Sequence, residues 1–374
     1  MSTQRIKKIG ILTSGGDAPG LNAVIRAAVI TATRQYNWEV VGINDGFEGL
    51  LDEEGKSLQP LILQDVISIL QQGGTILGTT NRGHFYFSED RPNELAHPEA
   101  ADQAITFCKE HGIDAIIAIG GDGTLRISHE LVKRGLPIVC VPKTIDNDLV
   151  GTDYTFGFDT ALDTATQAID QLRTTAASHN RVMVVEVMGR DTGWISLYAG
   201  IGGGAHVILI PEIPFRIEPI IKQIEWRDSI GANFTLVVVA EGAKPIDGER
   251  LYKAEAEEGG MQRLGGIAKW LCSQLDGNCN HDVREVVLGH LQRGGSPSAS
   301  DRVLCTRFGS EAVHLIQEGR TGTMVSLRGT SIQPVEMWKI VAQQKFVPFN
   351  GDLVQTARGL GICLGDSFGW GSQA

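Results

Sequence analysis

The sequence has 374 residues, of which 42% are hydrophobic and 21% charged, with a formal net charge of -11. This composition predicts a globular protein of about two domains, and its acidic balance argues against a general nucleic-acid or anionic-membrane surface. The early apolar run Ile9–Leu12 is too short for a signal peptide, and no later run approaches a membrane span, so we expect a cytoplasmic protein. Six scattered cysteines indicate neither a zinc site nor a disulfide framework.

The first predicted elements are a strand at Ile9–Leu12, a glycine-rich loop at Thr13–Gly20 and a helix from about Asn22 to Arg34. The loop contains Gly15-Gly16-Asp17, and the order of strand, Gly-Gly-Asp turn and helix recurs later in the chain. Two such turns on one sheet can hold opposite sides of a nucleotide, because each lends a helix N-terminus to the phosphates.

A second small-residue loop spans residues 73–82 and ends in Arg82, which could clamp a phosphate. Taken alone, this stretch favours a surface turn with a solvated arginine.

The most informative stretch runs from Ala115 to Asp148. It contains two unbroken apolar strands, Ala115–Ile119 and Ile138–Val141, and between them a helix for which Thr124 is the expected N-cap and Gly135 the stop. A glycine-rich turn follows the first strand and an acidic turn follows the second. Because ligands of open α/β sheets bind at the carboxyl ends of the strands, both turns are expected to face one cleft.

The residue types in these turns suit metal-assisted phosphoryl transfer. Glycines at 120, 121 and 123 let a polyphosphate approach the backbone amides, and Asp122 is a hard oxygen ligand for Mg²⁺. Thr144, Asp146 and Asp148 add a hydroxyl and two carboxylates, one of which can act as base. The alternative is a tight turn followed by a solvated acidic loop, which becomes less favoured when both turns occur at strand ends.

A second α/β domain is predicted to begin near Gly157. A helix starts at Asp159, and the expected strands are Val182–Val187, Val207–Ile210 and Phe234–Ala240. Polar residues again follow the strands: Met188-Gly189-Arg190 after the first and Glu241 after the third.

A buried strand is predicted near residue 286, and three residues that can carry positive charge lie around it: Arg284, His290 and Arg293. Cations are costly there unless an anion or a carboxylate meets them, so either an anionic ligand or a structural salt bridge is expected. The stretch from Thr321 is predicted to hold short strands, a helix around Val335–Val341 and little chemistry.

Together these motifs resemble the phosphofructokinases, which phosphorylate fructose 6-phosphate at its 1-hydroxyl. The resemblance covers nearly the whole chain and rests on five motifs in the family's order: Thr13–Asn22, Gly120–Gly123, Thr144–Asp148, Met188–Arg190 and Gly289–Gly295. It implies an α/β fold of two doubly wound three-layer domains with largely parallel sheets and the active site in the cleft between them. Residues 1–156 and 293–340 are expected to bind the nucleotide, and residues 157–292 and 341–374 the sugar phosphate.

The resemblance also implies roles for individual residues. Asp146 matches the base that takes the proton from the sugar hydroxyl, and Asp122 matches the Mg²⁺ ligand; Thr144 and Arg190 complete the catalytic set. The positions that hold the sugar phosphate or the transition state are Thr144, Asp146, Asp148, Arg181, Met188, Gly189, Arg190, Glu241, Arg284, His290 and Arg293. The nucleotide positions are Gly16, Arg82, Gly121, Asp122, Gly123 and Thr124, with Arg82 on a loop one residue longer than in the best-known bacterial enzymes.

In the family, the arginines matching Arg181 and Arg284 reach the sugar phosphate of a neighbouring subunit. The resemblance therefore implies a homo-oligomer, usually a homotetramer.

The signature of the phosphoryl donor is mixed. Pyrophosphate-using relatives have aspartate at the position of Gly123 and lysine at the position of Lys143, whereas the best-known ATP-dependent enzymes have glycine at the latter. We give Gly123 more weight, because a missing side chain admits the α-phosphate of ATP, and ATP with Mg²⁺ is the expected donor. Pyrophosphate is the alternative.

The regulatory positions depart from the allosteric bacterial enzymes. Arg26 matches the first of two effector arginines, but Ile30 stands at the second and His206 at the position of a usual glutamate, so the familiar ADP activation is not expected. More distant functional alternatives are a lipid or NAD kinase, and a catalytically silent sugar-phosphate-binding subunit.

Overall fold

The protein is described by a computed structural model that covers residues 6–80, 83–88, 94–254 and 263–370. The chain forms two compact units, which we describe separately. Unit 1 comprises Met1–Thr144, Leu149–Asp159 and Arg293–Gln344, and unit 2 comprises Ile145–Asp148, Thr160–Gln292 and Lys345–Ala374.

Unit 1 is built on a seven-stranded sheet in its described residues, with strand order β13-β12-β5-β4-β1-β2-β3. The strands are β1 (Lys8–Thr13), β2 (Glu39–Ile43), β3 (Leu58–Pro60), β4 (Ala115–Gly120), β5 (Ile138–Pro142), β12 (Thr323–Arg328) and β13 (Ser331–Glu336). The central strands are parallel, and the edge strands β3 and β13 pair antiparallel with their neighbours. The α/β class predicted from the sequence is thus confirmed.

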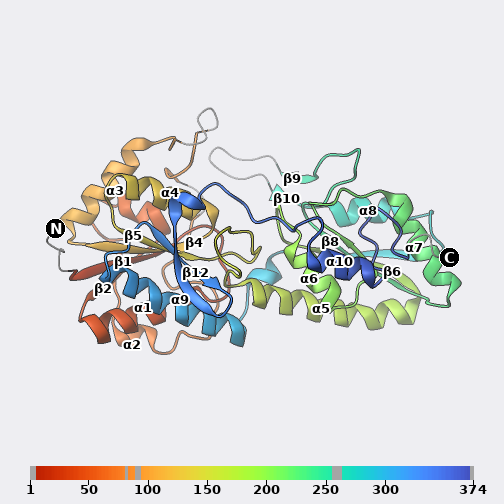
Figure 1. Cartoon of the computed structure of the whole chain (residues 1–374), viewed down its shortest axis with the longest axis horizontal. Helices are drawn as coiled ribbons and strands as arrows, with labels where there is room; N and C mark the ends of the chain where they lie inside the picture. Colours follow the sequence, from red (N-terminus) through yellow and green to blue (C-terminus); the bar gives the residue numbers. More distant parts are fainter. Residues whose placement is uncertain (1–5, 81–82, 89–93, 255–262, 371–374) are drawn as a thin grey trace. The chain divides into compact units, whose positions relative to one another are not determined.

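Both faces of this sheet are covered by helices, as Figure 1 shows. The helices are α1 (Leu21–Tyr36), α2 (Leu63–Val66), α3 (Pro98–Glu110), α4 (Asp122–Lys133) and α9 (Ala299–Gln317), with 3₁₀ helices at Gly46–Leu51 and Met337–Lys339. Alternate residues of β4 enter opposite cores: Ile117 and Ile119 pack with α1 and α9, and Ile116 and Ala118 with α3 and α4. Because both faces are buried, β4 is apolar without interruption.

Unit 2 contains a parallel four-stranded sheet of order β11-β6-β8-β7 in its described part. Its strands are β6 (Arg181–Val187), β7 (Val207–Leu209), β8 (Thr235–Ala240) and β11 (Asp282–Val287), and a separate antiparallel pair is formed by β9 (Tyr252–Ala254) and β10 (Arg263–Leu264). Its helices are α5 (Phe158–His179), α6 (Trp194–Gly202), α7 (Ile217–Ser229), α8 (Ile267–Leu275) and α10 (Asp352–Gly359), with a 3₁₀ helix at Gly289–Arg293 that extends into unit 1.

The structure corrects three sequence predictions. Residues around Val335–Val341 form the end of β13 and a 3₁₀ turn instead of a helix, because Ser331–Glu336 pairs along its length with β12. Helix α4 begins at Asp122 with Gly121 as N-cap, so Thr124 lies inside the first turn. Strand β11 is an edge strand with mostly exposed or half-exposed residues, so it is not the buried strand expected beside Arg284.

None of the helices in the described ranges combines the length and the apolar character that crossing a bilayer requires.

Candidate functional site

In unit 1, the loops after β1, β4 and β5 meet at one edge of the sheet. The three strands are parallel neighbours, so their carboxyl ends share this edge. The backbone N–H of Ser14 donates to the carbonyl of Ile119 over 3.0 Å, and the N–H of Lys143 donates to the carbonyl of Gly120 over 3.0 Å. The Gly-Gly-Asp loop, the Gly-Gly-Asp-Gly turn and the start of the acidic turn are therefore directly connected.

The glycines of the turn after β4 serve different purposes. A Cβ on Gly120 would overlap the side chain of Thr124, so glycine is required there for packing. A Cβ on Gly123 would meet none of the described residues within 4 Å, so the space in front of this residue is open among them. Asp122, Gly123 and Thr124 form the first turn of α4, where N–H groups have no partner within the helix and, with the helix dipole, favour an anion.

Two cations contact the backbone of the Gly-Gly-Asp loop. The ammonium of Lys143 donates to the carbonyl of Gly16, and Nη1 of Arg293 donates to the carbonyl of Asp17 over 2.9 Å. A Cβ on Gly16 would lie 2.9 Å from Nη1 of Arg293, so glycine permits this approach. Lys143 is only 4% exposed, and a buried cation is favoured where oxygen atoms or an anion surround it. The cluster suits a polyphosphate.

In unit 2, the residues after β6 and β8 form a second group. The backbone N–H of Arg190 donates to Oε1 of Glu241 over 3.2 Å, and the N–H of Glu241 donates to the carbonyl of Val187 over 2.9 Å. Arg190 has a φ of 49°, which is uncommon for a residue with a side chain, and Gly189 before it has a φ of 143°. This strained turn fixes Met188-Gly189-Arg190 against the end of the neighbouring strand.

The acidic turn of unit 2 lies next to the same loop. The hydroxyl of Thr192 lies 3.4 Å from the carbonyl oxygen of Asp146 and 3.3 Å from that of Gly189. Asp146 is 8% exposed, and Asn147 has a φ of 52°. The Thr192 hydroxyl thus links the Asp146 backbone to the Met188–Arg190 loop.

Arg181 and Arg284 are not part of this group. Arg181 is the first residue of β6, whereas Arg190 follows the end of the strand, and six residue steps of a strand span about 20 Å. Arg284 is the third residue of β11, which runs parallel to β6, so it too lies toward the amino ends of the strands, while His290 follows the carboxyl end. Arg82 lies outside the described residues.

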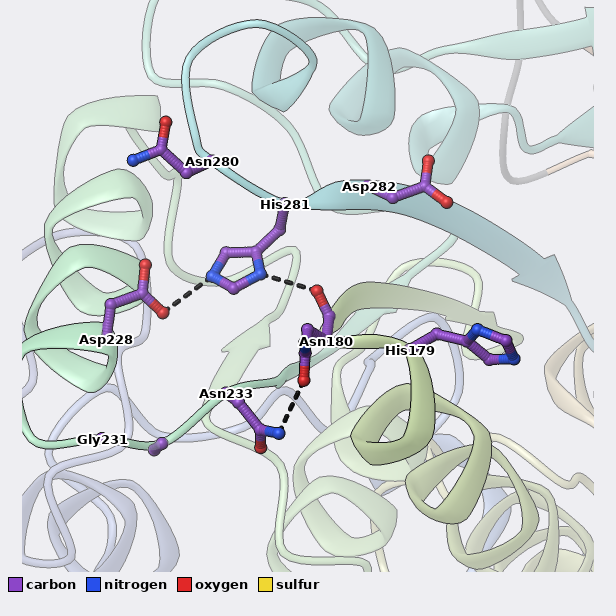
Figure 2. A pocket seen from close by; sticks show the side chains of 9 residues that line it. His179, Asn180, Asp228, Gly231, Asn233, Asn280, His281 and Asp282 are labelled. Carbon is purple, nitrogen blue, oxygen red and sulfur yellow. Dashed lines mark hydrogen bonds and ion pairs between the residues drawn. The ribbon is translucent and has the colours of Figure 1, made fainter.

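A surface pocket of about 450 Å³ lies at these amino ends, and Figure 2 shows it from close by. His281 lies between two acceptors there: Nε2 is 2.7 Å from Oδ1 of Asp228, and Nδ1 is 2.6 Å from the carbonyl oxygen of Asn180. Asp282, another residue of the pocket, forms ion pairs with Arg181 over 3.0 Å and with Arg284. No sequence pattern predicted these contacts.

Comparison with known proteins agrees with this architecture. A family model described as Phosphofructokinase matches residues 8–316. "ATP-dependent 6-phosphofructokinase" of Chloroflexus aggregans is 55% identical over 96% of this chain and 98% of its own length. "Pyrophosphate--fructose 6-phosphate 1-phosphotransferase" of Amycolatopsis methanolica is 49% identical over 91% of this chain and 96% of its own length.

Among solved structures, Pichia pastoris phosphofructokinase in the T-state matches with a TM-score of 0.75 and 34% identity. The match covers 91% of this chain and 36% of that one. Two α/β units with glycine-rich and acidic loops at the carboxyl ends of parallel strands define an α/β protein that binds its ligands at those ends. The chain belongs to the phosphofructokinase family.

Sequence reasoning missed three residues that the structure connects to the predicted ones: Thr192, Asp282 and Lys345. Thr192 lies two residues after Arg190 and could have been suspected from that position alone. The other two contact predicted residues only through long-range folding.

Proposed function

We propose that this protein is a 6-phosphofructokinase that transfers the terminal phosphoryl group of ATP to the 1-hydroxyl of fructose 6-phosphate. The observation that carries the proposal is the cluster of unit 1, where open space at Gly123, the N-terminus of α4 and the cations Lys143 and Arg293 surround the Gly16 loop. A helix N-terminus with converging cations stabilises the charge of a transferring phosphoryl group. The family and the name of the Chloroflexus relative support the same activity.

Asp146 is the general base in this proposal. It accepts the proton of the sugar 1-hydroxyl, and Thr144 and Arg190 assist at the reacting group. The remaining sugar-phosphate contacts are assigned to Asp148, Met188, Gly189, Glu241, His290 and Arg293, and the nucleotide contacts to Gly16, Arg82, Gly121, Gly123 and Thr124. Arg190 and Glu241 follow the adjacent parallel strands β6 and β8 and are joined by a hydrogen bond, which supports a sugar-phosphate site on unit 2.

Asp122 would hold Mg²⁺. It is the first residue of α4, beside the open space at Gly123. A single protein carboxylate fits Mg²⁺, because this ion usually fills its remaining coordination positions with phosphate oxygens and water. When bound, Mg²⁺ supplies positive charge to the donor phosphates.

The active site is completed by a second copy of the chain. Within one unit 2, about 20 Å of strand separates Arg181 from the loop that holds Arg190, so the two arginines cannot bind one phosphate. A neighbouring subunit that contributes Arg181 and Arg284 resolves this separation. A homotetramer, a cytoplasmic location and allosteric control remain predictions.

Pyrophosphate is the second candidate donor. The Amycolatopsis relative is named for it at 49% identity, and the family resemblance implies that pyrophosphate-using enzymes carry a lysine at the position of Lys143. Gly123 favours ATP, since among the described residues no atom lies within 4 Å of the position where a carboxylate-bearing side chain would start and repel the α-phosphate.

Steady-state rates with ATP and with pyrophosphate, measured side by side on the wild-type protein, test the identity of the phosphoryl donor.

The D146S variant tests the role of Asp146 as the base: turnover should fall by about 10²- to 10⁴-fold while fructose 6-phosphate still binds in calorimetry. D170S, which changes an exposed aspartate of α5, should keep wild-type turnover. Near-normal turnover of D146S would refute the base, and activity with pyrophosphate alone would replace ATP as donor.

A further inference from the structure

Lys345 forms two hydrogen bonds with the acidic turn of unit 2. The backbone N–H of Lys345 donates to the carbonyl of Asp148 over 2.7 Å, and its ammonium donates to Oδ1 of Asn147 over 2.9 Å. Asn147 is 3% exposed, so this hydrogen bond is shielded from water. Lys345 thus holds the two residues that directly follow Asp146.

Asn147 needs such support because of its backbone. Its φ of 52° lies in the left-handed region, which a residue with a side chain adopts rarely and which persists only where the surrounding structure fixes it. Asparagine tolerates this conformation better than most residues. The turn at Asn147 determines the direction in which the chain presents Asp146.

Lys345 itself contacts the first residue of helix α6. Nε1 of Trp194 donates to the carbonyl of Lys345 over 2.7 Å, and the Lys345 ammonium lies 5.7 Å from the centroid of the Trp194 ring. Two residues on, the N–H of Val347 donates to Oε1 of Glu212 over 2.9 Å, and the same oxygen accepts from the N–H of Gly193 over 3.1 Å. Gly193 is the N-cap of helix α6 and Trp194 is its first residue, so residues 345–347 are attached to the start of a helix.

These contacts act directly on the turn that follows Asp146, because Asn147 is its neighbour in the chain. We propose that Lys345 is a positioning residue for the phosphoryl transfer: by fixing the left-handed backbone at Asn147, it holds Asp146 in the orientation in which its carboxylate accepts a proton. This inference rests on the proposed function, in which Asp146 is the base.

The test compares K345M, K345R and K345Q with the wild type. K345M removes the side-chain hydrogen bond to Asn147, and we expect a 10- to 100-fold lower kcat with little change in the KM for ATP. K345R and K345Q each keep a donor for Asn147, so both should restore most of the lost kcat.

The matched control is K339M. Lys339 is exposed and also lies over a tryptophan, with its ammonium 5.1 Å from the Trp338 ring centroid, but among the described residues no hydrogen bond or ion pair links its side chain to the acidic turn. K339M should behave as wild type. Wild-type kcat in K345M would overturn the inference, and so would a kcat in K345R and K345Q as low as that of K345M, because both variants keep a donor for Asn147. If K345M does not fold by circular dichroism, N147G decides: it removes the acceptor of the Lys345 ammonium and should lower kcat, and wild-type kcat would overturn the inference. An inactive wild type with every donor would instead refute the proposed function.

Discussion

The carboxylate of Asp282 lies 3.0 Å from Nε of Arg181, where the parallel strands β11 and β6 begin side by side. Its other oxygen contacts Nη1 of Arg284. One carboxylate thus binds both arginines that the proposed function assigns to the sugar phosphate of a neighbouring subunit. The phosphate must compete with this carboxylate for the two guanidinium groups.

We therefore predict that D282N lowers the KM for fructose 6-phosphate. Asp282 is partly exposed, and exposed ion pairs contribute up to about 1 kcal/mol, so the expected change is about two- to fivefold. E285Q is the control, since it removes the same charge from an exposed position of the same strand. A higher KM in D282N would mean that Asp282 orients the arginines instead of competing for them.

Gly120 and Gly123 should respond differently to the same substitution. G120A forces a methyl group against the buried Thr124, and overpacking of this kind costs about 1–3 kcal/mol of unfolding free energy. G123A meets open space and should keep the wild-type melting temperature, while G123D should lower kcat/KM for ATP by repelling its phosphates. Thermal melts with donor kinetics on all three variants check this, and an unstable G123A would contradict it.

The core of the fold could be predicted because its signal is local. The runs Ile9–Leu12 and Ala115–Ile119 are apolar without interruption, which is what a strand buried on both faces requires. The prediction of a helix around Val335–Val341 was wrong because the spacing there looks helical although the chain forms a hairpin. Ser331–Glu336 pairs with Thr323–Arg328 across a two-residue turn, and this strand pairing overrides the helical spacing.

The candidate site could be derived from the sequence only where its residues lie close to a strand end. Asp122 lies two residues after β4 and Arg190 three residues after β6, so their positions could be derived from the strands. Lys345 contacts Asn147 across 198 residues of sequence, and Arg181 contacts Asp282 across 101. No local pattern encodes such contacts, because the intervening chain decides which residues return to the site.

His206 should make the protein less stable in acid. Burial, followed by the charges of Arg227 and Arg173, lowers the pKa of His206 to about 3, and its Nδ1 accepts the N–H of Leu236 over 2.9 Å. The unfolded chain takes up a proton below about pH 6.5 and the folded one does not until about pH 3, so stability is lost as pH falls through this window, by at most about 1.4 kcal/mol per pH unit.

H206N tests this, because the asparagine oxygen can still accept from Leu236 but does not titrate. Denaturant unfolding at pH 7.5 and pH 4.5 should show a smaller loss of stability in H206N than in the wild type. H179N, which changes an exposed histidine at the end of α5, should show the wild-type loss. Equal losses in H206N and the wild type would contradict the prediction.

Glu212 should have the opposite pH dependence. Burial raises its pKa, although the N–H groups of Val347 and Gly193 and the charge of Arg250 oppose this, and its Oε2 is buried without a hydrogen-bond partner among the described residues. In the window above the ordinary value of 4.5, the folded state holds more protons than the unfolded state, so stability contributed by Glu212 is lost as pH rises.

The unfolding free energy of E212Q relative to wild type should therefore increase between pH 4.5 and pH 8, because glutamine cannot ionise. E212A should be destabilised at both values by roughly 2–4 kcal/mol, since two backbone N–H groups lose their acceptor. Denaturant unfolding of both variants at the two pH values checks this. A difference between E212Q and wild type that stays constant or shrinks would show that the carboxylate is stabilised in its charged form, and that its hydrogen bonds to Gly193 and Val347 outweigh burial.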